Sequence, residues 1–132
     1  GASEIIQYVA GRNIPRAIAS SSLTSIINHF VKMLGWDDLI PQRYSADGMK
    51  HGKPAPDIYL HTAKQLGIEP EKCLALEDSR AGARAAVSAG MTCYVVPDLS
   101  HSAMSDFEDI TPHVYPSLHD VLEEIKTKRL FS

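Results

Sequence analysis

The chain has 132 residues, of which 44% are hydrophobic and 22% are charged, proportions typical of a single globular domain with a buried core. Thirteen basic and sixteen acidic residues give a net charge of −3. Without a stripe of Lys and Arg, this balance argues against a nucleic-acid-binding protein. No apolar run approaches the roughly 20 residues that a membrane-spanning helix needs, so we expect no membrane association.

The predicted elements alternate between helices and short apolar strands. In chain order they are a helix over 3–10 capped by Ser3, a strand over 16–20, a helix over 23–34, an edge strand over 43–45, a loop over 47–56, a helix over 57–66, a strand over 73–76, a helix starting at Ser79, a strand over 92–96, one helical turn within 100–113 and a helix over 118–126. Glycine follows most of these helices and predicts their ends.

The two cysteines, Cys73 and Cys93, lie far apart in apolar, strand-like runs. This pattern predicts two buried thiols and neither a disulfide nor a zinc site. Free thiols are typical of a reducing compartment, so we expect a cytoplasmic protein.

Short, continuously apolar strands between helices are typical of a parallel sheet covered on both faces. We therefore predict an α/β fold with a doubly wound, Rossmann-like parallel sheet, in one domain that spans residues 1–132. Such folds bind ligands beyond the carboxyl ends of their strands. Three polar segments stand at or near these ends.

The first polar segment is the serine loop, which comprises Ser20, Ser21 and Ser22. Hydroxyls and unpaired amides meet there at the start of a helix, which favours an anion. The alternative is that Ser22 simply caps the helix.

In the second segment, Lys53 precedes two prolines that stiffen its backbone, and its ammonium can neutralise a phosphate. The alternative is a solvated surface lysine.

The third polar segment is the acidic pair, Glu77 and Asp78, which follows a buried strand. Adjacent carboxylates repel each other unless a cation or a donor is near. Carboxylate oxygens are the protein ligands that Mg²⁺ prefers. The alternative is that Asp78 or Ser79 caps the next helix. Together, the three segments offer an anion cradle, a cation and a metal ligand, a combination that fits phosphoryl transfer.

Three strings of this sequence resemble motifs of the haloacid dehalogenase superfamily, most closely its beta-phosphoglucomutase-like phosphatase branch. AIASSS resembles the second motif, HGKPAPDIY the third and LEDSRAGARAAVSAGM the fourth, and the resemblance covers about residues 3–125. It implies a Mg²⁺-dependent phosphohydrolase that acts on a small phosphorylated metabolite, such as a sugar phosphate, through an aspartyl-phosphate.

The resemblance also implies roles for individual residues. Ser20 donates a hydrogen bond to the transferring phosphoryl group, Ser21 contributes its amide, and Ser22 lies beside them. Lys53 neutralises charge on the phosphoryl group and the nucleophile. Asp78 is the Mg²⁺ ligand, and Glu77 supports the metal directly or through water. Ser20, Lys53 and Asp78 are thus the expected catalytic residues.

One family motif is absent from these 132 residues. The first motif, Asp-x-Asp-x-Thr/Val, supplies the nucleophile, and no Asp of this chain has that spacing after an apolar strand. The helical cap that follows this motif is absent as well. The sequence therefore resembles the C-terminal portion of the family's core, with residues 1–12 as the helix that returns from the cap. We expect the chain alone to be inactive.

In the family, the strand that carries the nucleophile lies mid-sheet, between the strands predicted at 16–20 and 73–76. Without it, two inner strand edges are exposed. We expect a separate N-terminal segment or self-association to complete the sheet. Other functional hypotheses remain: a phosphomutase of the beta-phosphoglucomutase type, a non-catalytic phosphate-binding module, or an interaction protein that pairs through its open sheet.

Overall fold

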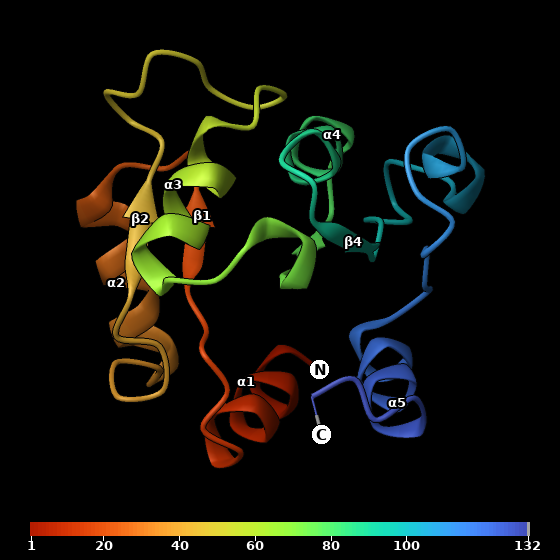
Figure 1. Ribbon diagram of the computed structural model, residues 1–132. Coiled ribbons are helices and arrows are strands. Elements are labelled where there is room, and N and C mark those ends of the chain that lie inside the picture. Colours follow the sequence, from red (N-terminus) through yellow and green to blue (C-terminus); the bar gives the residue numbers. More distant parts are fainter. Residues whose placement is uncertain (132) are drawn as a thin grey trace.

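The computed structural model describes residues 1–131 and shows helices around short parallel strands (Figure 1). The elements are α1 (Ala2–Gly11), β1 (Ile18–Ser20), α2 (Thr24–Leu34), β2 (Arg43–Ser45), α3 (Asp57–Leu66), the 3-10 turn η1 (Pro70–Lys72), β3 (Leu74–Glu77), α4 (Arg80–Ser88), β4 (Thr92–Val95), the 3-10 turn η2 (Met104–Phe107) and α5 (Leu118–Thr127). Every predicted helix and strand is present, within a few residues of its expected bounds.

The strands form two separate parallel pairs. β1 pairs with β2, with Ile18 opposite Arg43, and β3 pairs with β4, with Leu74 opposite Thr92. Val114 adds a parallel bridge to β4 at Val95. The predicted α/β class with parallel strands is confirmed. Within residues 1–131, β1 and β3 each pair on one side only and not with each other, which agrees with the expected absence of a central strand.

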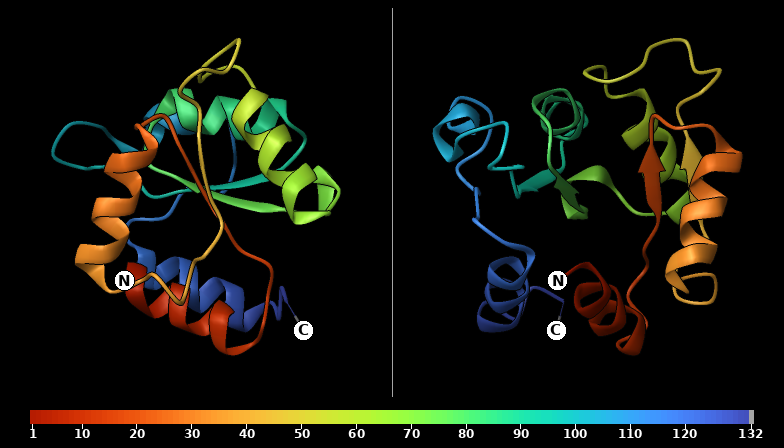
Figure 2. Two further views of the ribbon diagram at one scale, coloured as in Figure 1. Left: turned by 90° about the vertical axis from the view of Figure 1, so that its left-hand side faces the viewer. Right: turned by 180° about the vertical axis from the view of Figure 1, so that it is seen from behind.

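Two hydrophobic clusters lie on opposite faces of β4. Cys93 and Val95 pack with the buried residues of α3, α4 and η2. Tyr94, which points to the other face, packs with Ile5 of α1 and with buried residues of α5. Figures 1 and 2 show the same arrangement, with α1 and α5 side by side across the strands from α3 and α4. The pair of strands β3 and β4 therefore has helices on both faces, as the predicted doubly wound fold requires.

The helix ends confirm some predicted caps and overturn one. Gly35 and Gly67 end α2 and α3 with φ values of 73° and 70°, a conformation that glycine adopts without strain. Ser79 caps α4 by accepting from the amide of Gly82. The predicted cap at Ser3 is wrong: α1 begins at Ala2, and the Ser3 hydroxyl accepts from the Trp36 indole at 3.2 Å.

The prediction of two buried thiols is half right. Cys93 is buried, but β3 begins one residue later than expected, so Cys73 lies before it and is only partly covered. Neither cysteine forms a disulfide.

The outer face of α2 is unusually apolar. Five exposed side chains of α2 and its N-cap residue are hydrophobic: Leu23, Ile26, Phe30, Met33 and Leu34. Ile26, Phe30 and Leu34 border an apolar hollow between α2 and β1. Among residues 1–131, no helix is both long and apolar enough to cross a membrane.

Candidate functional site

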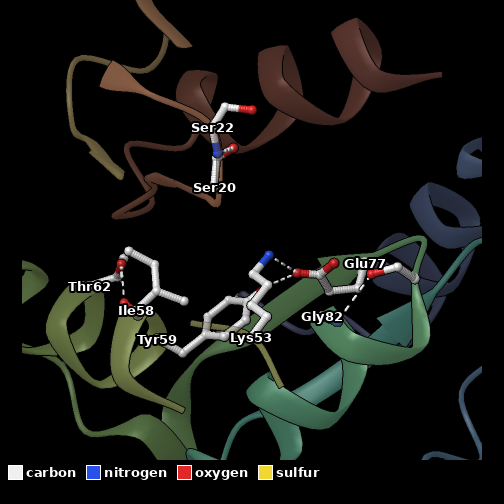
Figure 3. Close-up of polar contacts among 9 residues, drawn as sticks. Ser20, Ser22, Lys53, Ile58, Tyr59, Thr62, Glu77 and Gly82 are labelled. Carbon is white, nitrogen blue, oxygen red and sulfur yellow. Dashed lines mark hydrogen bonds and ion pairs between the residues drawn. The ribbon is translucent and has the colours of Figure 1, made fainter. Parts of the chain in front are cut away.

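Lys53 and Glu77 meet at the carboxyl end of β3 (Figure 3). The Lys53 Nζ donates to Glu77 Oε2 at 2.7 Å, and the two side chains are only 14% and 7% exposed. The prolines after Lys53 and the buried strand before Glu77 bring these residues together across 24 positions of sequence. A buried ammonium and a buried carboxylate neutralise each other, which lowers the cost of removing either charge from water.

Tyr59, in the first turn of α3, contacts both members of this pair. Its hydroxyl donates to the same Oε2 atom of Glu77, and its ring faces the Lys53 ammonium at 5.2 Å. Burial and the neighbouring Glu77 carboxylate raise the pKa of the Tyr59 phenol well above its ordinary value, so the phenol stays protonated and remains a donor. One aromatic side chain therefore holds the carboxylate and lies against the cation.

Gly82 gives the Glu77 carboxylate room against α4. A Cβ atom added at Gly82 would lie 1.9 Å from Glu77 Oε1. Glycine in a helix interior costs up to about 1 kcal/mol relative to alanine, and here the close approach of the carboxylate explains it. We call Lys53, Tyr59, Glu77 and Gly82 the lysine–glutamate cluster.

Asp78 differs from its neighbour, because its side chain is exposed where β3 gives way to α4. The alternative role considered for Asp78 or Ser79 was to cap α4. Ser79 is the residue that does so. The acidic pair offers the hard oxygen ligands that suit Mg²⁺, which typically binds one or two protein carboxylates together with phosphate oxygens and water. Within residues 1–131 no three potential metal ligands gather.

The serine loop leaves β1 and enters α2. Ser20 Oγ accepts from the amide of Ser22 at 3.1 Å, and α2 has Leu23 at its N-cap, with no side-chain cap. Ser22 therefore does not cap the helix, which removes the alternative considered for this segment. Among residues 1–131 the Ser20 hydroxyl accepts this hydrogen bond and donates none.

The structure brings some of the predicted site residues into contact and leaves others apart. Lys53 and Glu77 form an ion pair, whereas within residues 1–131 no hydrogen bond joins the serine loop to Lys53 or to the acidic pair. In Figure 3, Ser20 and Ser22 lie across from the Lys53 side chain without touching it.

Sequence reasoning missed Tyr59, Gly82 and Ser45, each of which contacts a predicted site residue. Two signals could have found the first two. A tyrosine on the buried face of a helix needs a partner for its hydroxyl, and an isolated glycine inside a helix indicates a close approach. Ser45, at the end of an edge strand, carries no such signal.

The chain is similar to a family of hydrolases. A family model described as haloacid dehalogenase-like hydrolase matches residues 1–90. A bifunctional riboflavin kinase/FMN phosphatase from Arabidopsis thaliana is 31% identical over 131 residues, which cover 98% of this chain and 32% of that protein. The fructose-1-phosphate phosphatase YqaB from Escherichia coli (strain K12) is 34% identical over 88 residues, covering 67% of this chain and 46% of that protein.

Solved structures agree with these relatives. The crystal structure of a HAD family hydrolase from Deinococcus radiodurans R1, with bound phosphate and sodium, superimposes with a TM-score of 0.88 at 27% identity, covering 98% of this chain and 59% of that one. Beta-phosphoglucomutases are also among the matching structures. The chain thus spans a third to three-fifths of the length of these similar proteins.

Proposed function

Because this chain belongs to the haloacid dehalogenase-like hydrolases, we propose that it is the phosphate-binding and metal-binding portion of a Mg²⁺-dependent phosphatase. The proposed substrate is a small phosphorylated metabolite of the sugar-phosphate kind. Two named relatives, a fructose-1-phosphate phosphatase and an FMN phosphatase, remove phosphate from such molecules.

The observation that carries this proposal is the buried ion pair between Lys53 and Glu77. The pair lies beside the exposed Asp78 and across from the serine loop. Cations, carboxylates and hydrogen-bond donors arranged around one space are what phosphoryl transfer requires, since its catalysis consists mostly of positioning and charge neutralisation.

In the proposed reaction, an Asp carboxylate oxygen attacks phosphorus and the bond between phosphorus and the ester oxygen breaks. The leaving oxygen takes up a proton and departs as an alcohol. Water then cleaves the resulting aspartyl-phosphate to release inorganic phosphate and restore the Asp. The attacking Asp comes from outside these 132 residues, which lack the nucleophile motif. This chain alone is therefore inactive.

The residues of this chain bind the phosphoryl group and hold its charge. The Ser20 hydroxyl and the Ser21 amide donate to phosphoryl oxygens, with Ser22 alongside. Lys53 places its ammonium against the transferring group. Asp78 is the Mg²⁺ ligand, and Glu77, already held by Lys53 and Tyr59, supports the metal site from behind. When bound, Mg²⁺ neutralises charge on the phosphoryl oxygens.

A strand from an N-terminal segment, or from a second copy of the chain, completes the sheet between β1 and β3. The support is that each of these strands is paired on one side only among residues 1–131. In this proposal residues 1–132 form one core domain, and residues 1–12 are the helix that returns from the cap. Both cysteines are free thiols, which supports a cytoplasmic location.

Phosphate binding and turnover test the proposal separately. Titration of inorganic phosphate into the ¹⁵N-labelled chain with Mg²⁺, followed by NMR, should shift the amides of Ser20, Ser21 and Lys53 together. Ser20→Ala and Lys53→Met should weaken this binding, whereas Lys72→Met, which alters an exposed lysine, should leave it unchanged.

The same chain should not hydrolyse p-nitrophenyl phosphate in the presence of Mg²⁺. Turnover that Asp78→Ala abolishes would show that these 132 residues contain a nucleophile after all. Phosphate shifts that Lys53→Met leaves intact, or that scatter over the surface, would contradict the assignment of the phosphate site.

A further inference from the structure

The end of β2 is bonded to the serine loop at two points. The amide of Ala46 donates to the carbonyl of Ser20 at 2.8 Å, which extends the parallel ladder by one bond. The hydroxyl of Ser45 donates to the carbonyl of Ser22 at 2.5 Å. Two alternate carbonyls of the serine loop are therefore held on the β2 side.

This tethering fixes the direction of two amides. A peptide unit is planar and trans, so its N–H points opposite to its C=O. With the carbonyl of Ser20 directed at β2, the amide of Ser21 points away from β2, toward the edge where β1 has no strand partner. The carbonyl of Ser22 fixes the amide of Leu23 in the same way. Neither amide donates to any group within residues 1–131.

Ser45 also links the serine loop to the segment that carries Lys53. Its Oγ accepts from the amide of Asp47 at 3.0 Å while it donates to Ser22. Asp47 begins the loop that leads to Lys53. One hydroxyl thus joins the two segments proposed to contact the phosphate.

We propose that Ser45 is a positioning residue of the phosphate site, whose hydroxyl directs the amides of Ser21 and Leu23 at a single phosphoryl group. This inference rests on the proposed function and adds to it. It names the side chain that organises the serine loop and adds the Leu23 amide to the phosphate donors. Ser45 itself does not touch the phosphate.

The matched variants Ser45→Thr and Ser45→Val test this role. Both side chains are β-branched and suit a strand, but only threonine keeps a hydroxyl. Titration of inorganic phosphate into the full chain, followed by ¹⁵N NMR, should give the wild-type affinity for Ser45→Thr. Ser45→Val should bind about five-fold more weakly, which is the worth of one ordinary hydrogen bond. Ser88→Ala, on the exposed end of α4, is the control and should not change the affinity.

Amide hydrogen exchange without phosphate gives a second readout. Exchange at Ala46 and Asp47, whose amides donate to the Ser20 carbonyl and to Ser45 Oγ, should be faster in Ser45→Val than in Ser45→Thr, while exchange in β4 stays the same. Equal phosphate affinities for the two variants would overturn the role of Ser45 and leave the proposed function standing. A wild-type chain whose serine-loop amides do not respond to phosphate would overturn both.

Discussion

The lysine–glutamate cluster beside β3 and the outer face of α2 beside β1 differ in how far the chain covers them. In the cluster, two charges and a phenol are buried and bonded to one another. On α2, Phe30 and Met33 are 51% and 62% exposed, and within residues 1–131 the neighbouring β1 pairs along one edge only. The buried charges of the cluster are paired within the chain, whereas the α2 side exposes apolar side chains beside a strand that is paired on one side only among residues 1–131.

The largest effect should come from breaking the buried ion pair. Lys53→Met leaves the buried Glu77 carboxylate bonded to the Tyr59 hydroxyl but without its ammonium partner, and we expect a loss of about 3 kcal/mol in the free energy of unfolding. Urea denaturation measures it. The double variant Lys53→Met/Glu77→Gln should lose less than the single variant, because no unpaired charge remains. A loss below about 1 kcal/mol for Lys53→Met would mean that the pair is solvated.

A smaller effect should follow from filling the space at Gly82. The added methyl of Gly82→Ala overlaps the Glu77 carboxylate, and we expect a net loss of about 1–2 kcal/mol. In a Glu77→Ala background the sign should reverse, because only the higher helix propensity of alanine remains. Gly11→Ala, where an added Cβ meets nothing within 4 Å, is the control. An equal change in the free energy of unfolding for Gly82→Ala in both backgrounds would contradict the close packing of Gly82 against Glu77.

A still smaller, pH-dependent effect is expected at the surface clamp between α4 and the segment after η2. Arg80 forms two hydrogen bonds of 2.9 Å with Asp109, which lower the pKa of Asp109 from 3.8 to about 2. Because this pKa is depressed in the folded state, the stabilisation is present above pH 3.8 and is lost as the pH falls through 2. The clamp is exposed, so added salt should weaken it.

Thermal unfolding between pH 6 and pH 2 checks this clamp. The wild type should have a higher melting temperature than Asp109→Asn at pH 6, and this difference should disappear between about pH 4 and pH 2. A difference between the two proteins that stays constant with pH would show that the carboxylate charge of Asp109 has no part in it.

The smallest change in stability is expected on the uncovered face. Met33→Lys should alter the free energy of unfolding by no more than about 0.5 kcal/mol, while lowering self-association at high concentration in analytical ultracentrifugation. Ile27→Ala, at a buried position of the same helix, should cost about 2 kcal/mol or more. A large loss of stability for Met33→Lys would show that the chain itself covers this face.

The sequence predicted those parts of the fold that depend on local rules. Gly35 and Gly67 mark helix ends because they adopt positive φ, and the apolar strands appear where expected. The Ser3 cap was wrong because the Trp36 indole, 33 positions away, takes its hydroxyl as an acceptor. Similarly, Tyr59 and Ser45 act through partners distant in sequence, which no local pattern specifies.

The convergence of Asp78 and the serine loop on one phosphate is tested most directly with Mn²⁺ in place of Mg²⁺, because bound Mn²⁺ broadens nearby NMR signals. We predict broadening around Asp78 when the metal is added, extending to Ser21 and Ser22 once inorganic phosphate is present, and lost in Asp78→Asn. Broadening that centres on other acidic residues such as Asp37 and Asp38, or that never reaches the serine loop with phosphate bound, would contradict a shared site.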